Sequence, residues 1–116
     1  GKVVYLDFWA SWCKPCRQSF PWMNAMQKKY AERGLVIIAV NLDAQKEDAE
    51  RFLKAMPAGF QVIYDPDGEL AQQYKLVGMP SSFLIGADGH VAARHEGFFE
   101  NSPQKYEAEI QGLFAR

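Results

Sequence analysis

One stretch near the start of the chain decides the fold and reads Asp7-Phe8-Trp9-Ala10-Ser11-Trp12-Cys13-Lys14-Pro15-Cys16. Its first residues complete an almost continuously apolar run over residues 3–10, which is typical of a strand buried on both faces of a sheet. Residues 13–32 then have the composition of a helix, with apolar side chains at helical spacing. Ser11 is a potential cap of this helix. The two cysteines therefore lie where a buried strand is followed by a helix.

Strands and helices alternate along the rest of the chain. We expect further strands over residues 35–42, 60–64, 82–85 and 91–95. We expect further helices over residues 46–56, 69–75 and 103–114, the last of them with Ser102 as its cap and Pro103 at its first position. Asp43 is a potential cap of the first of these, and Pro21 should kink the helix that follows the cysteines. This order predicts an α/β fold in which a mixed central β-sheet has helices on both faces.

Length and composition indicate one globular domain over residues 1–116. The chain has 116 residues, of which 48% are hydrophobic and 23% are charged, a balance typical of a folded domain. Thirteen Lys and Arg side chains against fourteen Asp and Glu give a net charge of -1, so we expect no nucleic-acid partner. The longest apolar run, over residues 35–40, is too short to span a bilayer.

The start of the sequence bears on where the protein works. The chain begins with Gly1 and Lys2, which are followed at once by the first expected strand. It has neither an initiator methionine nor a signal peptide. We therefore expect any export signal or membrane anchor to lie upstream of this sequence.

The two cysteines indicate chemistry rather than a structural bridge. Cys13 and Cys16 are the only cysteines in the sequence, and a disulfide that closes so small a loop stabilises little. A sulfur anion at Cys13 would be stabilised by the backbone N–H groups at the start of the helix and by the neighbouring Lys14. Cys16 lies one turn later, where it could resolve a mixed disulfide formed at Cys13.

A metal site is the alternative interpretation of this pair. A four-ligand site would need two more side chains, and the histidines available are His90 and His95. Their separation from Cys16 far exceeds that of a zinc finger, and both lie in an expected hairpin, where exposure to solvent is usual. We therefore expect no metal and no cofactor. A Cu(I)-binding module that uses the cysteines with a histidine or Met79 stays open as an alternative.

Asp7 is the one charged residue in the first expected strand. A carboxylate in such an apolar strand is costly unless it is paired or protonated. Burial would raise its pKa, which suits a proton acceptor near physiological pH. The alternative is that Asp7 lies on a solvated face.

Taken together, these residues resemble the active-site segment of the thioredoxin superfamily. Pro21 lies where that family kinks its active-site helix, Gly78-Met79-Pro80-Ser81 resembles its cis-proline loop, and Gly97 matches the glycine after its last strand. The closer likeness is to the TlpA/ResA type. That likeness rests on residues 40–43 followed by an extra helix, on residues 64–68, and on residues 80–85 with Asp88-Gly89.

The resemblance implies a thioredoxin-like fold and a thiol-disulfide oxidoreductase of the bacterial periplasm. Such proteins are exported or anchored to the membrane, and they typically reduce disulfides in other proteins, often in apocytochrome c before haem attachment. A membrane thiol-transfer protein re-reduces them. The resemblance therefore implies disulfide-bearing protein substrates, this electron donor, and no cofactor beyond the redox-active Cys13–Cys16 disulfide.

The resemblance also assigns roles to individual residues. It implies that Cys13 is the attacking nucleophile, that Cys16 is the resolving thiol, and that Asp7 relays a proton to or from Cys16 through water. It implies that substrate contacts a cis proline and its apolar surroundings, namely Pro80, Met79 and Trp12. Phe98 and Phe99, which follow Gly97, could extend that surface or pack in the core.

Two residues depart from the family pattern. Ala39 occupies the position at which thioredoxins pair the buried acid with a lysine, and Ser19 stands where reductases dedicated to cytochrome maturation often have a glutamate. Three other functions stay open. They are a dithiol oxidant, in which Lys14 and the helix end stabilise the reduced thiolate, the metal-binding module, and an adaptor without catalysis.

Overall fold

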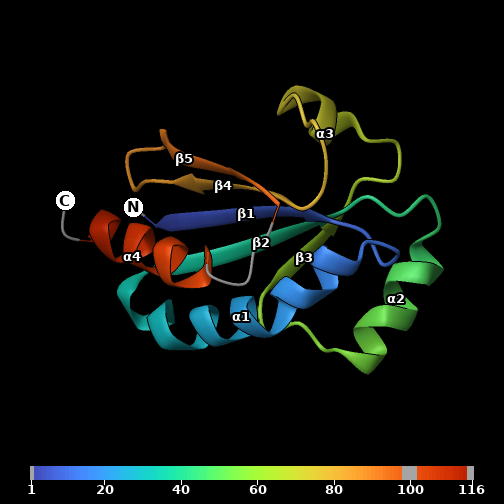
Figure 1. Ribbon diagram of the computed structural model, residues 1–116, viewed down its shortest axis with the longest axis horizontal. Helices are drawn as coiled ribbons and strands as arrows, with labels where there is room; N and C mark the ends of the chain where they lie inside the picture. The colour runs from blue at the N-terminus through green and yellow to red at the C-terminus, as the bar shows by residue number, and fades with distance from the viewer. Residues whose placement is uncertain (1, 98–101, 115–116) are drawn as a thin grey trace.

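A five-stranded β-sheet organises the part of the chain that the computed structural model describes, residues 2–97 and 102–114 (Figure 1). The strands are β1 (Val3–Trp9), β2 (Leu35–Asn41), β3 (Gln61–Tyr64), β4 (Ser81–Ile85) and β5 (Val91–Glu96). Their order in the sheet is β3-β2-β1-β4-β5. The pairs β1–β2 and β2–β3 are parallel, whereas β1–β4 and β4–β5 are antiparallel. The sheet is therefore mixed, as the sequence predicts.

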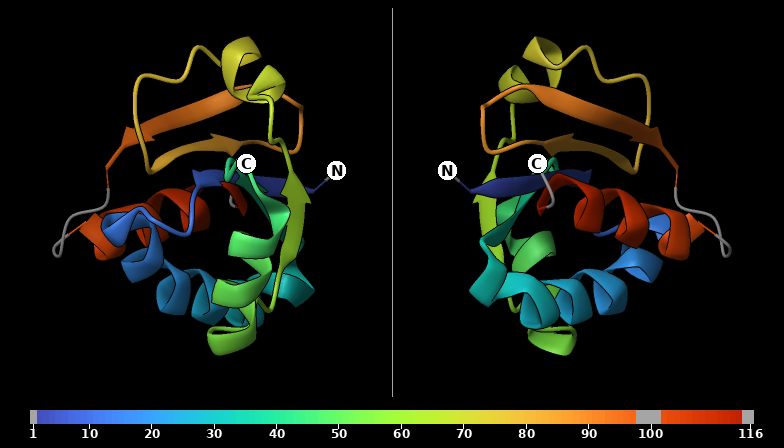
Figure 2. Two further views of the ribbon diagram at one scale, coloured as in Figure 1. Left: turned by 90° about the vertical axis from the view of Figure 1, so that its right-hand side faces the viewer. Right: turned by 90° about the vertical axis from the view of Figure 1, so that its left-hand side faces the viewer.

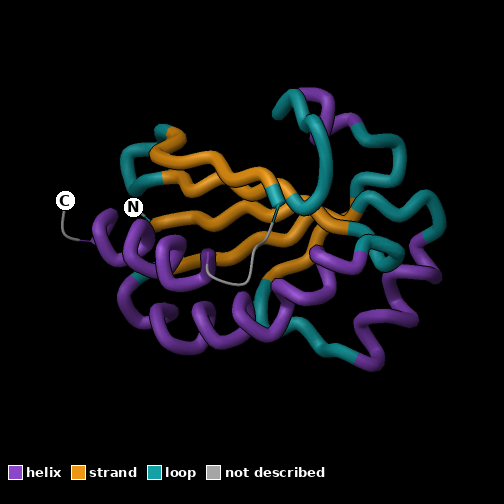
Figure 3. Tube along the Cα trace, viewed as in Figure 1, coloured by secondary structure: helices purple, strands orange, loops and turns teal. Residues whose placement is uncertain are grey.

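Helices cover both faces of the sheet, but unequally. They are α1 (Lys14–Tyr30), α2 (Lys46–Ala55), α3 (Glu69–Gln73) and α4 (Ser102–Phe114), with a short 3-10 turn over Ala31–Arg33. Residues of α1, α2 and α4 pack into the larger core cluster on one face, and α3 packs on the smaller cluster of the other face (Figures 2 and 3). The predicted α/β thioredoxin-like fold is confirmed.

The described helices were also compared with the length and hydropathy of a membrane-spanning helix. Within residues 2–97 and 102–114, no helix combines the length and the apolar character that a bilayer crossing requires.

Strand β1 is buried on both faces because it lies between the two core clusters. Tyr5 and Trp9 point into the larger cluster, while Leu6 and Phe8 point into the smaller one. Successive side chains of a strand point to opposite faces, so a strand covered on both sides needs an apolar residue at nearly every position. This explains why the run over residues 3–10 is apolar at every position except Asp7.

Helix α1 is fixed on the sheet along its buried face. Phe20 and Met23 are fully buried in the larger cluster. The amide of Gln27 binds strand β2 at two points, donating to the Leu35 carbonyl at 2.8 Å and accepting from the Ile37 N–H at 2.8 Å. Pro21 lies inside the helix, and the kink that we expect there stays a prediction. The buried face of α1 is therefore held against the sheet, with its last turns tied to β2.

Two of the helix caps predicted from the sequence are wrong. Helix α1 has Cys13 rather than Ser11 at its N-cap, and α2 has Gln45, whose side chain makes no capping bond. A capping oxygen binds the N–H two or three residues further on, and Asp43 and Ser11 lie too early in the chain to do so. Instead, the Ser11 hydroxyl donates a hydrogen bond to the Asp43 carboxylate.

Candidate active site

Cys13 and Cys16 form a disulfide at the start of α1, with their Cα atoms 5.2 Å apart. Cys13 is the N-cap residue, and its sulfur accepts a hydrogen bond from the Cys16 backbone N–H at 3.4 Å. The two residues differ in accessibility, because Cys13 keeps 6% of its surface exposed and Cys16 keeps none. Both residues are therefore largely buried, and of the two only Cys13 presents any surface to a second thiol.

The first turn of α1 has an electrostatic bias toward a sulfur anion. It contains no acidic residue, and Lys14 directly follows Cys13. Pro15 occupies a first-turn position, where its missing N–H leaves no bond unmade. Unpaired backbone N–H groups and the positive end of the helix dipole lie at this end. These are the surroundings that lower the pKa of a cysteine.

Asp43 holds the loop that leads into the cysteines. Its carboxylate accepts hydrogen bonds from the Ser11 backbone N–H at 2.9 Å and from the Ser11 hydroxyl at 2.8 Å. The Asn41 side-chain amide donates to the same carboxylate at 2.8 Å, and the Asn41 carbonyl oxygen accepts from the Asp43 N–H at 3.0 Å. The loop between β1 and α1 is thus tied to the end of β2.

Sequence reasoning missed this role of Asp43. The available signal is the pattern Asn41-Leu42-Asp43 at the end of a buried strand that runs parallel to β1. Carboxyl ends of adjacent parallel strands lie at the same edge of a sheet, so polar side chains there reach the neighbouring loop.

Asp7 is buried in the middle of β1, with 2% of its surface exposed. Its cross-strand neighbours are Ala39 in β2 and Ser82 in β4. Among the described residues its Oδ2 atom has no hydrogen-bond partner. Burial raises the pKa of the Asp7 carboxyl well above its ordinary value. The alternative of a solvated Asp7 is therefore wrong, and the neighbouring Ala39 offers no charge to balance it.

The loop before β4 lies at the same end of the sheet as the cysteines. Ser81 pairs with Phe8 near the end of β1 because the two strands are antiparallel. The Met79–Pro80 peptide bond is cis, which is the isomer that the resemblance implies. Pro80 is buried and Met79 is half-buried, whereas Trp12 in the cysteine loop keeps 70% of its surface exposed.

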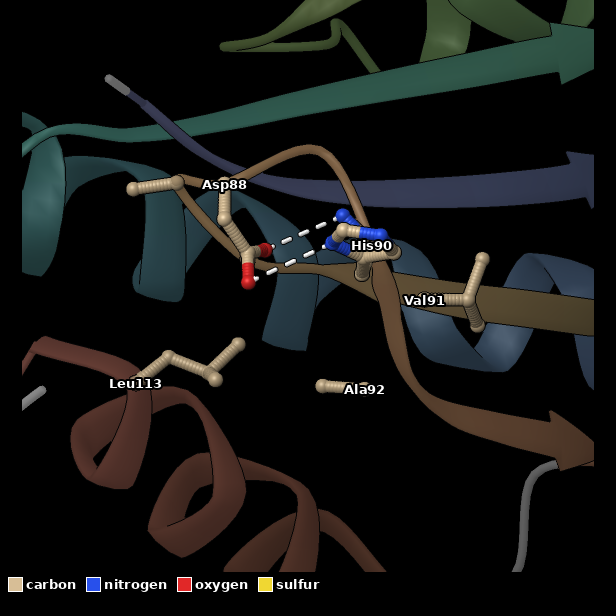
Figure 4. Close-up of a pocket in the computed structure, with 7 residues that line it drawn as sticks. Asp88, His90, Val91, Ala92 and Leu113 are labelled. Carbon is tan, nitrogen blue, oxygen red and sulfur yellow. Dashed lines mark hydrogen bonds and ion pairs between the residues drawn. The ribbon is translucent and has the colours of Figure 1, made fainter.

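The two histidines do not join the cysteines. His90 lies at the β4–β5 turn, where its backbone N–H and its ring both contact Asp88 in a shallow pocket (Figure 4). This turn follows the end of β4 that pairs with Val4, so it lies at the opposite end of the sheet from Cys13. The expectation that His95 is exposed is wrong, because α4 covers it and both its ring nitrogens have partners.

Two further expectations concern metal ligands and the last aromatic pair. Within residues 2–97 and 102–114, no three His, Cys, Asp or Glu side chains gather as a metal site would require. Phe98 and Phe99 lie outside the described residues.

Comparison with known protein families shows which family this chain belongs to. A family model described as AhpC/TSA matches residues 1–94. The chain belongs to the AhpC/TSA family. This places it in the thioredoxin superfamily and confirms the resemblance drawn from the cysteine segment.

Relatives within this superfamily include proteins named for thiol-disulfide exchange. The chain is 40% identical over 97 residues to thiol-disulfide oxidoreductase ResA of Bacillus thuringiensis, covering 84% of this chain and 56% of that protein. The chain therefore spans little more than half the length of that relative.

Solved structures show the same fold. A crystal structure attributed to thiol:disulfide interchange protein DsbE of Chlorobium tepidum has a TM-score of 0.96 and 52% identity, covering 98% of this chain and 81% of that one. The crystal structure of StoA of Bacillus subtilis has a TM-score of 0.81 and 26% identity, and the match covers 95% of this chain and 83% of that one.

The buried Asp7 carboxyl predicts how stability depends on pH. Above about pH 4 the unfolded chain releases the Asp7 proton, whereas the folded protein with its raised pKa retains it. The free energy of unfolding should therefore fall as pH rises, until the folded carboxyl ionises too. Replacing Asp7→Asn removes this loss, so the variant should match the wild type near pH 4 and exceed it by at least about 1 kcal/mol at pH 8.

Urea unfolding of both oxidised proteins at a series of pH values measures this difference. Asp48→Asn, which changes an exposed carboxylate on α2, is the control and should leave the pH dependence unchanged. If the free energies of unfolding of wild type and Asp7→Asn change with pH in parallel, Asp7 ionises normally in the folded protein.

The contacts of Asp43 predict a second measurable effect. Asp43→Ala leaves the Ser11 N–H and the Asn41 amide without their charged acceptor, which should reduce the free energy of unfolding by about 2 kcal/mol. Amide hydrogen exchange of residues 11–13 should speed up more than exchange in the middle of β1. Equal acceleration in both places would mean that Asp43 does not hold the cysteine loop.

Proposed function

We propose that this chain is a thiol-disulfide oxidoreductase that reduces disulfides in other proteins. The observation that carries this proposal is the unequal placement of the two sulfurs at the start of α1. Cys13 keeps a small exposed surface and its sulfur accepts a hydrogen bond from the Cys16 N–H, while Cys16 has no exposed surface. An attacking thiolate must be accessible and stabilised, whereas a resolving thiol needs only to reach the first.

The first step is an exchange at Cys13. In the reduced protein the Cys13 thiolate attacks one sulfur of the substrate disulfide, a new S–S bond joins Cys13 to the substrate, and the other substrate sulfur leaves as a thiolate. The neighbouring Lys14 and the first-turn N–H groups hold the anion before the attack.

The second step uses Cys16 and Asp7. The Cys16 thiol gives its proton to the Asp7 carboxylate, directly or through water, and the resulting thiolate attacks the Cys13 sulfur. The second substrate sulfur leaves, so the substrate has gained two electrons and the protein ends with the Cys13–Cys16 disulfide. Asp7 suits this role because burial raises its pKa toward that of a thiol.

The substrate contacts proposed for this reaction lie at one end of the sheet. Trp12 gives an exposed apolar surface beside Cys13, and Val77, which is 76% exposed, extends it from the loop before β4. The half-buried Met79 and the cis Pro80 follow Val77 in the same loop. An extended peptide with a disulfide could lie across this surface, with the Met79 backbone as its contact.

We further propose an extracytoplasmic location in the bacterial periplasm, with export or membrane anchoring by a segment outside this sequence. The electron donor would be a membrane thiol-transfer protein, and the cysteine pair would need no other cofactor. This proposal rests on the resemblance to the TlpA/ResA type and on relatives named ResA and DsbE. Apocytochrome c is one candidate substrate, although Ser19 replaces the glutamate typical of reductases dedicated to it.

A serine at position 16 should trap the intermediate. Cys16→Ser cannot resolve the mixed disulfide, so covalent complexes with disulfide-bearing proteins should accumulate on non-reducing gels and dissociate with dithiothreitol. Cys13→Ser is the matched control and should trap none, because the remaining thiol is buried. A failure of Cys16→Ser to form complexes with any disulfide substrate would remove the mechanism.

The reduction potential of the Cys13–Cys16 pair decides whether the protein gives electrons to its substrates or takes electrons from them. A reductant should have a Cys13–Cys16 potential nearer to that of thioredoxin, about -270 mV, than to that of the oxidant DsbA, about -120 mV. Equilibration with glutathione or dithiothreitol buffers measures it. A value in the DsbA range would assign the chain to the dithiol oxidants, with Lys14 and the helix end stabilising the reduced form.

A further inference from the structure

We propose that a buried chain of hydrogen bonds, running from Tyr5 through Ser82 and His95 to Glu109, carries the proton between Asp7 and solvent during thiol-disulfide exchange. This inference rests on the role proposed above for Asp7. It assigns a function to buried polar groups that the exchange steps themselves do not use.

The chain of bonds is continuous from the core to the surface. The Tyr5 hydroxyl donates to Ser82 Oγ at 3.0 Å, Ser82 Oγ lies 3.2 Å from His95 Nδ1, and His95 Nε2 lies 2.9 Å from Glu109 Oε2. Tyr5, Ser82 and His95 are all buried, whereas the Glu109 side chain is 27% exposed. Glu109 is therefore the point at which the chain meets water.

The inner end of the chain lies beside Asp7. Ser82 is the cross-strand partner of Asp7, and opposed side chains of an antiparallel pair have Cβ atoms about 5 Å apart. Tyr5 lies two residues before Asp7, so both side chains point to the same face of β1. Burial first, and the Asp7 charge second, raise the pKa of Tyr5. The two side chains therefore share one buried face of β1.

Each group in the chain can accept a proton on one side and donate on the other. No hydrogen bond joins Asp7 to this chain among the described residues, so the first transfer, from Asp7 to the Tyr5 oxygen, passes through water. The Tyr5 proton then moves to Ser82, and the Ser82 proton moves to His95 Nδ1. The proton on His95 Nε2 then moves to Glu109, which releases it to water. One proton enters, one leaves, and rotation of the hydroxyls and the exchange of the imidazole tautomer restore the starting state.

The reaction needs such a route because substrate covers the nearer one. Cys16 is fully buried under the loop that carries Cys13 and the exposed Trp12. In the mixed disulfide the substrate is attached at Cys13, so it covers this surface when the Cys16 proton has to leave. The route through Glu109 opens on α4, away from the attached substrate.

Among the described residues, Glu109 is the charged side chain that binds His95. On α4, Tyr106 stacks on the His95 ring with centroids 3.8 Å apart, and Glu109 binds it. From the sheet, Ser82 and Tyr5 face it. The charged residues next to it on β5, Arg94 and Glu96, point to the other face by the alternation of the strand.

The decisive measurement is the rate of the second step, followed in a single turnover as release of a substrate thiol from the preformed mixed disulfide. Glu109→Gln and His95→Ala should slow this step by about tenfold or more, with a changed solvent deuterium isotope effect. The Cys13–Cys16 reduction potential should stay unchanged, because a relay alters rates in both directions equally. Added imidazole should restore the rate of His95→Ala and saturate with concentration.

The chain offers a matched control for each variant. Glu107→Gln changes a carboxylate on the same helix that binds Lys29 and Tyr30 instead, and His90→Ala removes the other histidine. Both should resolve the mixed disulfide at the wild-type rate. His95→Gln, which keeps a polar side chain, covers the case in which His95→Ala does not fold.

The outcomes separate this inference from the function on which it rests. If Asp7→Asn resolves the mixed disulfide as fast as wild type, the role proposed for Asp7 is wrong. If Asp7→Asn is slow but Glu109→Gln and the His95 variants are not, the relay alone is wrong. A slow His95→Ala that imidazole does not restore, with an unchanged isotope effect, would show that the network only supports the fold and would overturn the relay.

Discussion

The burial of strand β1 between two apolar layers is the constraint on which the rest of the structure depends. It makes β1 the centre of the sheet, with a parallel neighbour on one side and an antiparallel neighbour on the other. The end of β1 therefore meets the end of β2 and the start of β4. Cys13, Asp43 and Pro80 come together at that edge although they are far apart in the sequence.

Local patterns in the sequence predict most of this arrangement. The apolar runs give the strands, and the alternation of strands and helices gives the mixed sheet. The unequal cover of the two sheet faces is harder to predict from local patterns. Helix α3 has only five residues whereas α1 has 17, so loop residues beside α3 complete the smaller core cluster. Cys13, Cys16 and Asp7 could be singled out because each is unusual for its position in a strand or at a helix end.

Asp43 and His95 could not be assigned correctly, because their environments are set by distant residues. Asp43 binds Ser11, 32 residues earlier, while its own neighbourhood suggests a helix cap. His95 lies in a strand at the edge of the sheet, where exposure is the usual expectation, but α4 returns over it and supplies Glu109. A local pattern specifies whether a residue is polar, whereas the tertiary fold decides which partner it meets.

The departure at position 39 gives this site its own proton chemistry. In thioredoxins a lysine stands there, whereas here Ala39 lies beside Asp7 and leaves the buried carboxyl without a cation. Among the described residues, burial alone shifts the pKa of this carboxyl, and it raises it, so no ammonium group there holds Asp7 ionised. The polar groups on the opposite side of β1, beginning with Ser82, are then the ones within reach. In the relay proposed above, the buried hydrogen-bonded network on the β4 side would take the place of the missing charge on the β2 side, because it would give the buried Asp7 carboxyl a route for exchanging its proton.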